Sequence, residues 1–126
     1  MRQSPLCVLI VGDDPTVVQL IDRILKKTSW KCRTDCASNS SELIRILHRL
    51  RPDIVVLDLD LSEESSLLLY RDIHESDWNP KILCVNGNST GEIQTRILNS
   101  GASAILTKPF KAHALVEKIQ NLFPWL

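Results

Sequence analysis

The stretch IVVLD at residues 54–58 decides the fold, because a run of four apolar residues ends there in a carboxylate. A short apolar run of this kind is typical of a strand that is buried on both faces of a parallel sheet. Parallel strands need a crossover connection between them, and that connection is usually a helix. The stretch therefore predicts an α/β fold in which Asp58 lies at the carboxyl end of a buried strand.

Two further apolar runs are followed by charged residues in the same way. Leu6 to Val11 is followed by Asp13 and Asp14, and Ala104 to Leu106 is followed by Lys108. The carboxyl ends of parallel strands lie along one edge of the sheet, where open α/β folds bind their ligands. We therefore expect these carboxylates and the lysine to meet the carboxylate that ends IVVLD in one crevice.

Strand and helix signals alternate about five times along the chain. The expected strands cover residues 6–11, 31–36, 54–57, 81–85 and 104–107, and the expected helices run from Pro15 to about Lys26, from a cap at Ser40 or Ser41 to Leu50, from about Ser65 to Glu75, from about Thr90 to Asn99, and from just after Phe110. The second strand is polar and alternating, which is typical of an edge strand. Such units predict a doubly wound, five-stranded parallel sheet with helices on both faces. The strand order 2-1-3-4-5 places strands one and three side by side, so that Asp13, Asp14 and Asp58 converge.

Length and composition indicate one ordinary globular domain. The chain has 126 residues, and we expect a single domain over residues 1–126 with no output domain visible. Its 15 basic and 15 acidic residues cancel, which argues against electrostatic binding to nucleic acid or to an anionic membrane. No apolar run has the length of a membrane span or of a signal peptide core, so the cytoplasm is the expected compartment.

The cysteines and histidines do not form a metal-binding pattern. Cys7 and Cys84 fall inside expected strands, where a thiol packs as a small apolar side chain. Cys32 and Cys36 have no second ligand pair beside them in the sequence, so we expect buried or half-buried thiols there. The histidines are expected on the surface of three helices, at His48, His74 and His113.

Crowded carboxylates point to chemistry at the expected crevice. Carboxylates that lie close together repel one another unless they are protonated or neutralised by a cation. Mg²⁺ or Mn²⁺, held by a few oxygens and sharing a phosphate, neutralises such a cluster. A screened carboxylate is a competent nucleophile toward phosphorus, and the ammonium of Lys108 and the metal ion stabilise the phosphoryl oxygens. The alternative is that Asp58 and Lys108 form only a structural ion pair.

Four segments together resemble the receiver domain of bacterial two-component response regulators. They are VLIVGDDP at residues 8–15, IVVLDLDLS at 54–62, ILCVNG at 82–87 and SGASAILTKPF at 100–110. The resemblance covers essentially the whole chain and implies a fold like that of the chemotaxis regulators. It implies that Asp58 is the acceptor of a phosphoryl group from a histidine kinase or a phosphotransfer protein. It also implies a cis bond between Lys108 and Pro109.

The resemblance assigns the remaining site residues as well. Asp13 and Asp58 bind the metal ion, with Asp14 as a weaker candidate, and Lys108 pairs with Asp58 and with the phosphoryl group. Asn86 takes the switch position at the end of the fourth strand. The downstream protein target is expected on the face formed by the fourth helix, the fifth strand and the fifth helix. The cognate kinase, the output and the oligomeric state do not follow from the sequence.

The chain departs from the family pattern at the first acidic position. That position carries Gly12, so Asp13 aligns with the acid that binds the metal directly and Asp14 with a third acid before Pro15. A shift by one residue, with a longer first strand, restores the acidic pair as Asp13-Asp14. If Gly12 is a true loss, the affinity for the metal should be lower because one charge is missing.

Further departures affect the residues that report phosphorylation. Asn86 replaces the usual hydroxyl side chain, and Ile105 replaces the usual aromatic residue of the fifth strand. Asp60, in the loop after the acceptor, either acts on a hydrolytic water or is a solvated loop acid. These changes predict an atypical receiver in which phosphorylation at Asp58 is possible and the response is altered.

Two rival functions fit parts of the same pattern. A pseudo-receiver keeps the fold for protein contact without a phosphoryl cycle. The run DLD at residues 58–60 also resembles the nucleophile motif of haloacid-dehalogenase-type phosphohydrolases, with Asp58 as nucleophile and Asp60 as acid/base. That family places the motif near its N-terminus and needs an acidic pair after the lysine, whereas only Glu117 follows Lys108 here. We therefore expect a signalling domain and not a turnover enzyme.

Overall fold

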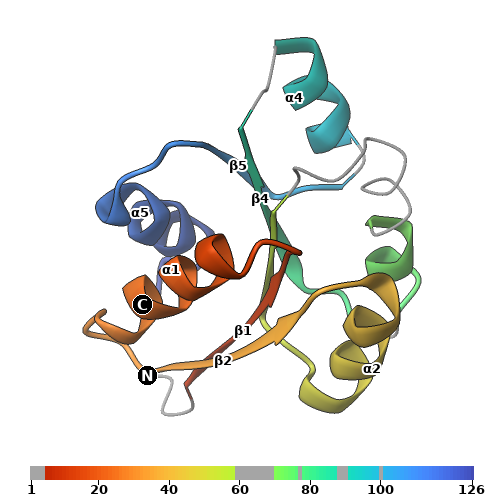
Figure 1. The fold of residues 1–126 in the computed structure, drawn as a ribbon, viewed down its shortest axis with the longest axis horizontal. Helices are drawn as coiled ribbons and strands as arrows, with labels where there is room; N and C mark the ends of the chain where they lie inside the picture. Colours follow the sequence, from red (N-terminus) through yellow and green to blue (C-terminus); the bar gives the residue numbers. More distant parts are fainter. Residues whose placement is uncertain (1–4, 59–69, 77, 88–90, 100) are drawn as a thin grey trace.

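The fold of the chain is known from a computed structural model that describes residues 5–58, 70–76, 78–87, 91–99 and 101–126. Five parallel strands form one sheet in the order β2-β1-β3-β4-β5, as predicted. The strands are β1 (Leu6–Val11), β2 (Cys32–Ala37), β3 (Ile54–Asp58), β4 (Lys81–Asn86) and β5 (Ala104–Thr107). Figure 1 shows the sheet nearly edge-on, with β2 at one border and β5 at the other. The prediction that the polar second strand lies at an edge is confirmed.

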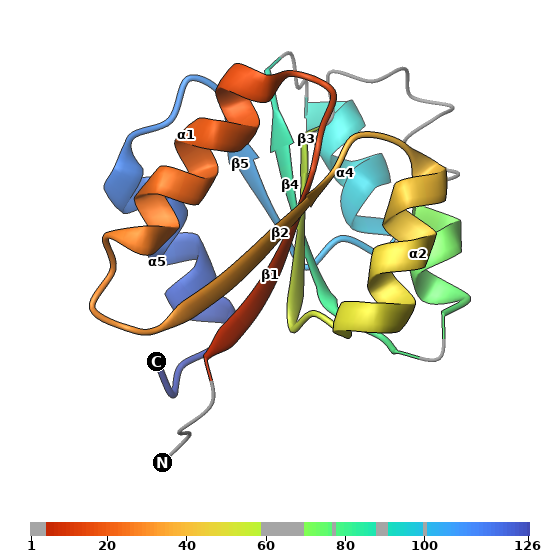
Figure 2. The same cartoon turned by 60° about the horizontal axis from the view of Figure 1, so that its bottom comes forward.

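Helices cover both faces of the sheet, which confirms the doubly wound architecture. The helices are α1 (Pro15–Lys26), α2 (Ser40–Leu50), α4 (Gly91–Asn99) and α5 (Ala112–Leu122), and residues 70–74 are also helical. Figure 2 shows α1 and α5 on one side of the sheet and α2 and α4 on the other. The first part of the helix expected over 65–75, residues 65–69, lies outside the described residues.

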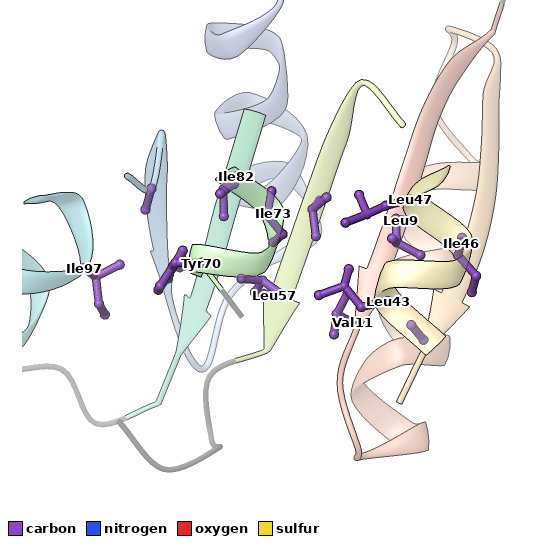
Figure 3. Close-up of a cluster of buried hydrophobic side chains, with 14 residues drawn as sticks. Leu9, Val11, Leu43, Ile46, Leu47, Leu57, Tyr70, Ile73, Ile82 and Ile97 are labelled. Atoms are coloured by element: carbon purple, nitrogen blue, oxygen red, sulfur yellow. The ribbon is translucent and has the colours of Figure 1, made fainter. Parts of the chain in front are cut away.

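The strands are apolar on both sides because each face packs against helices. Alternate residues of β1, β3 and β4 point to opposite faces, so the core divides into two clusters. Figure 3 shows the cluster beneath α2, residues 70–74 and α4, in which side chains from the strands interleave with helical ones. Its labelled members are Leu9, Val11, Leu43, Ile46, Leu47, Leu57, Tyr70, Ile73, Ile82 and Ile97. The other cluster lies beneath α1 and α5 and includes Val8, Ile10, Ile21, Val56, Val85, Leu115 and Ile119.

The start of α2 differs from the prediction of a serine cap. Asn39 is the N-cap, and its side chain accepts a hydrogen bond from the backbone N–H of Glu42 at 3.0 Å. Glu42 in return accepts from the backbone N–H of Ser38 at 2.9 Å, which holds the pKa of this carboxyl below its usual range. Asn39 is free to cap because its backbone is extended, whereas Ser40 already has helical geometry. The cap is therefore one residue earlier than expected.

Other boundaries differ from the prediction by a residue or two, as strand and helix ends commonly do. β2 begins and ends one residue later than expected, and β3 and β4 each extend by one residue to include Asp58 and Asn86. Both extensions follow from the ladder, because Asp58 pairs with Val85 and Asn86 pairs with Thr107. The two polar side chains therefore belong to the sheet itself.

The four cysteines are free thiols in different surroundings. Cys84 is buried against the hydroxyl group of Tyr70, and burial raises the pKa of its thiol to about 12. Burial also raises the pKa of the half-buried Cys32 to about 11. Cys7 is half-buried, whereas Cys36 is exposed on the edge strand β2, so the prediction of a buried or half-buried thiol at Cys36 is wrong. In the described part of the chain, no helix is long and apolar enough to cross a membrane.

Gly101 lies in the connection between α4 and β5 and has a backbone conformation that residues with a Cβ rarely adopt. Its φ is +118°, and a Cβ at this position would lie 1.8 Å from Nε2 of His74. Glycine is therefore the residue that suits this turn after α4, because it has no Cβ to clash.

Replacing Gly101 by alanine should lower the free energy of unfolding by about 1–3 kcal/mol, because the backbone is strained for any residue with a Cβ. Gly91→Ala is the matched control, since nothing lies within 4 Å of a Cβ there and alanine favours the helix by up to about 1 kcal/mol. Urea unfolding of both variants measures the difference. Equal losses in the two would contradict the assignment, and His74→Ala in the Gly101→Ala background should recover only the steric part.

Candidate functional site

The site is built around Asp58, the last residue of β3. β3 lies between β1 and β4 in the sheet, and Asp58 pairs with Val85 in the β4 register. Its side chain is only 1% exposed. Removing a carboxylate from water is unfavourable unless a counter-charge or hydrogen-bond donors compensate it. The buried carboxylate of Asp58 therefore requires a cation or hydrogen-bond donors close to it at this edge of the sheet.

Lys108 supplies that charge from the end of β5. Its Nζ lies 2.6 Å from Oδ1 of Asp58, as a hydrogen bond and an ion pair, and the lysine side chain is 17% exposed. The lysine backbone is fixed as well, because its N–H donates to the carbonyl oxygen of Asn86 at 2.9 Å. The peptide bond to Pro109 is cis, as the family resemblance implied. The expected meeting of Asp58 and Lys108 is confirmed.

Asn86 lies at the same edge, as the last residue of β4. It follows Val85, the register partner of Asp58, and is 7% exposed. Buried polar side chains at the carboxyl ends of neighbouring strands bring hydrogen-bonding groups toward one crevice. A carboxamide carries both a donor and an acceptor, so Asn86 can donate to an anion bound near Asp58.

Gly12 brings the backbone after β1 directly against the acceptor side chain. β1 ends at Val11, and the backbone N–H of Gly12 donates to the carbonyl oxygen of Ala37 at 3.0 Å. A Cβ on Gly12 would lie 3.0 Å from the Cβ of Asp58 and 3.3 Å from a methyl carbon of Val18. The strand therefore ends before Gly12, and Gly12 is the residue that lies beside Asp58 on the β1 side.

Asp13 and Asp14 have different surroundings although they are neighbours. Both are exposed, and Asp14 is the N-cap of α1, with its Oδ1 accepting from the backbone N–H of Thr16 at 3.0 Å. An N-cap oxygen compensates an unpaired helical N–H group, so the Asp14 carboxylate stabilises the start of α1. Asp13 is the better metal candidate of the two.

The chemistry of the oxygen donors fits a hard divalent ion. Asp13 and Asp58 both carry carboxylate oxygens, and Mg²⁺ commonly takes one or two carboxylates and completes its shell with waters and phosphate oxygens. Among the residues that the structure describes, no group of three or more histidine, cysteine or acidic side chains could hold a metal ion. Asp60 and the loop 61–66, which the sequence singled out, lie outside the described residues.

Ile105 occupies the face of β5 that points toward α4. It is half-buried, pairs with Cys84 of β4, and packs against the cluster that contains Tyr70 and Ile97. A branched aliphatic side chain in this position offers neither a ring nor a hydroxyl group to the site. The side chain of Ile105 therefore contributes to the packing between β5 and α4.

Two contributors to the site were not found from the sequence. The methyl group of Val18 closes one side of the space beside Gly12, and the backbone carbonyl of Asn86 fixes Lys108. Val18 belongs to the apolar stripe of α1, so nothing in the pattern separated it from ordinary core residues. A backbone carbonyl leaves no signal in a sequence at all.

Comparison with known proteins establishes the family. The family model described as the response regulator receiver domain matches residues 8–120. The chain belongs to the response regulator receiver domain family. The transcriptional regulatory protein TrcR of Mycobacterium tuberculosis is 30% identical over 119 residues, which cover 94% of this chain and 46% of that protein. The chemotaxis protein CheY of Thermotoga maritima is 25% identical over 115 residues, covering 91% of this chain and 95% of that protein.

Solved structures agree with this family. A signal receiver domain from Bermanella marisrubri is 29% identical, has a TM-score of 0.81, and matches 94% of this chain and 98% of that one. The chain spans about half the length of several curated regulators that it matches, among them two mycobacterial proteins at 46% and 50%. Receiver domains are signalling modules of two-component systems and interact with histidine kinases or phosphotransfer proteins. The receiver domain described here is therefore a signalling domain of that type, and neither rival function is favoured.

Gly12 should be intolerant of any side chain, because β3 and α1 leave it little space. We expect Gly12→Ala to lower the free energy of unfolding by about 1–2 kcal/mol through overpacking against Asp58 and Val18. Urea unfolding measures this, with Gly91→Ala again as the open-space control. In a double-mutant cycle, Val18→Ala should reduce the loss. A Gly12→Ala protein as stable as the parent would contradict the close packing.

Proposed function

We propose that Asp58 accepts a phosphoryl group from the phosphohistidine of a histidine kinase or a phosphotransfer protein. The observation that supports this role is the 2.6 Å contact between Nζ of Lys108 and Oδ1 of Asp58 at the carboxyl edge of the sheet. Phosphoryl transfer depends mainly on the position of the nucleophile and on the cations around it. Asp58 and Lys108 both lie at this edge. The Asp58 side chain is buried, and the Lys108 side chain is partly accessible.

In the transfer step a carboxylate oxygen of Asp58 forms a bond to phosphorus. The bond between phosphorus and the donor's imidazole nitrogen breaks, and its electron pair returns to that nitrogen. The ammonium group of Lys108 neutralises the Asp58 carboxylate, which reduces the repulsion between this carboxylate and the anionic phosphoryl group of the donor. Bound Mg²⁺ or Mn²⁺ would add Lewis-acid neutralisation of the phosphoryl oxygens from a position on Asp13 and Asp58.

The product changes the charge at the edge of the sheet. A phosphoryl group brings about −1.5 to −2 charges and three acceptor oxygens. Lys108 can move its hydrogen bond from Asp58 to these oxygens, and the carboxamide of Asn86 can donate to another. Because Asn86 is the terminal residue of β4 and its carbonyl holds Lys108, both responses act on the ends of adjacent strands.

The response further along the domain is expected to be altered. We place the contact with a downstream protein on the face of α4, β5 and α5, as in the family to which the chain belongs. Ile105 packs against the core cluster that includes Ile97 of α4, and it has no ring that could change its exposure. The coupling free energy between two allosteric sites is typically about 1–3 kcal/mol. We expect the coupling between Asp58 and the face of α4, β5 and α5 to be weaker here, because Ile105 has no aromatic ring. The proposal covers residues 1–126 as one receiver domain in the cytoplasm, without turnover as an enzyme and without direct binding to nucleic acid or a membrane.

Incubation with acetyl phosphate and Mg²⁺ followed by intact-mass measurement tests the acceptor. The parent protein should gain the mass of one phosphoryl group, and Asp58→Asn should gain none. Asp35→Asn is the matched control. Asp35 lies on the edge strand β2, outside the site, and pairs with Arg49 of α2 at 3.1 Å. A parent protein that stays unmodified would support the pseudo-receiver or the purely structural ion pair, and a gain retained in Asp58→Asn would assign the acceptor to another residue.

The two neighbouring aspartates should differ in their effect on the metal. We expect Asp13→Asn to weaken Mg²⁺ binding by about tenfold or more, because it removes a charged oxygen ligand. Asp14→Asn should change it by less than about twofold, since asparagine is an equally good N-cap. Titration of Mg²⁺ into unmodified protein, followed through the amide NMR signal of Gly12, measures both. A larger effect of Asp14→Asn would favour the alignment shifted by one residue.

A further inference from the structure

The strand β2 forms an open border of the sheet. It pairs with β1 on one side and is the last strand in the order β2-β1-β3-β4-β5. Figure 2 shows β2 with α1 on one side of it and α2 on the other. An edge strand presents a row of backbone N–H and C=O groups that can pair with another chain. The open side of β2 is therefore a candidate contact surface.

Alternate residues of β2 direct their backbone groups toward this open side. The carbonyl oxygens of Lys31 and Ala37 face β1, because they accept hydrogen bonds from the first residue of β1 and from the residue after it, at 2.9 and 3.0 Å. Successive residues of a paired strand direct their backbone groups to opposite sides. The residues of β2 whose backbone groups point away from β1 are therefore Cys32, Thr34 and Cys36.

The sequence of β2 is symmetric in its chemistry about Thr34. Arg33 and Asp35 flank it with opposite charges, and Cys32 and Cys36 flank these in turn. An antiparallel copy of the same strand, paired about Thr34, places Arg33 opposite Asp35 and Cys32 opposite Cys36. The edge is therefore complementary to itself in charge.

Asp35 is accessible, and one of its oxygens is released by this pairing. Its side chain is 38% exposed, and Oδ2 accepts from Arg49 of α2 at 3.1 Å. Oδ1 accepts from the backbone N–H of Cys36 at 2.8 Å. In an antiparallel ladder this N–H donates to a carbonyl oxygen of the other strand, so Oδ1 becomes available to a second guanidinium. Arg33, which is exposed and two residues away on the same face of the strand, supplies it from the other copy.

We propose that two copies of this chain associate through antiparallel pairing of their β2 strands, with a two-fold axis at Thr34. Residues whose backbone groups face the opposite strand form hydrogen-bonded pairs, so Thr34 pairs with its own copy and Cys32 pairs with Cys36. Arg33 and Asp35 form the closer, non-hydrogen-bonded pairs, where opposite charges stabilise a sheet. The two-fold axis makes each of these contacts occur twice.

This dimer leaves both phosphoacceptor sites open. The two β2 strands run in opposite directions, so the carboxyl edges of the two sheets lie at opposite edges of the joined sheet. Within each copy, β1 separates β2 from β3, the strand that ends at Asp58. Association through β2 is therefore independent of phosphorylation at Asp58.

Charge reversal tests the register of the two strands. Sedimentation velocity of the unphosphorylated chain should show a monomer that becomes a dimer as the protein concentration rises. Arg33→Asp and Asp35→Arg should each weaken the dimer by about tenfold or more, because each places like charges opposite one another at both symmetric contacts. A mixture of the two variants should form a heterodimer, and the double variant should form a homodimer again, since every cross-strand pair then has opposite charges. A chain that stays monomeric, or single variants that the mixture does not rescue, would overturn the proposal.

Two controls separate the edge from general surface charge. Arg23→Asp reverses an exposed arginine on α1, away from the edge, and should leave the dimer unchanged. Arg49→Ala removes the partner of Asp35 within the chain and should not weaken the dimer. Circular dichroism establishes that each variant is folded. Controls that weaken the dimer as much as Arg33→Asp would overturn the proposal.

Disulfide trapping tests the pairing independently. The Cα atoms of a hydrogen-bonded antiparallel pair are about 5.5 Å apart, which suits a disulfide. Within one copy, Cys32 and Cys36 are four residues apart on a strand, about 13 Å, which is too far. Oxidised glutathione should therefore link Cys32 of one copy to Cys36 of the other: the two protein thiols form a disulfide, and the glutathione disulfide is reduced to two glutathione thiols.

Peptide mass mapping without reductant identifies the linked residues. Cys32→Ser and Cys36→Ser should each prevent trapping of the dimer, whereas Cys7→Ser on β1 should not. A dimer linked only between two Cys36 side chains would indicate chance collision of exposed thiols. That result, or equal trapping of Cys32→Ser, would overturn the proposal.

Discussion

The position of β3 is the constraint on which the rest of the molecule depends. This strand lies between β1 and β4 and is buried along its whole length, so both faces of the sheet must be covered by helices. Parallel pairing with both neighbours then requires crossovers, and the crossovers place the ends of all five strands at common edges. Asp58 is the first polar side chain after the buried run. The architecture thus delivers one carboxylate to the carboxyl edge in a place where water is largely excluded.

That carboxylate explains the arrangement around it. An isolated buried charge is unfavourable by several kcal/mol, and the ammonium of Lys108 compensates it at 2.6 Å. Lys108 is itself held through its backbone by Asn86, so the compensating charge is fixed to the neighbouring strands. Gly12 leaves room for the Asp58 side chain on the β1 side. Among the described contacts at this edge, the ammonium of Lys108 is the cation that neutralises the Asp58 carboxylate.

Different parts of the domain offer different surfaces for contact. The carboxyl edge holds a compact charged site with buried members, suited to covalent chemistry on a small group. A groove between α1 and α5 is lined mainly by apolar side chains, with Arg23 and Lys27 among its polar lining residues. Among the described residues of α4, Leu98 is exposed to solvent.

The sequence by itself determined the alternation of strands and helices, the strand order and the pairing of Asp58 with Lys108, because buried runs and strand-end charges follow directly from the need to cover both faces of a parallel sheet. It also identified the unusual residues Asn86 and Ile105. The structure also decided two local contacts that the sequence pattern left open, the caps that Asn39 forms on α2 and Asp14 forms on α1. Only tertiary packing decided that Gly12 abuts Asp58 and Val18 and that α1 and α5 enclose a groove with Arg23 and Lys27 along it. Periodicity shows which side of a helix is apolar, but the distance between two side chains from separate elements is set only when the elements pack.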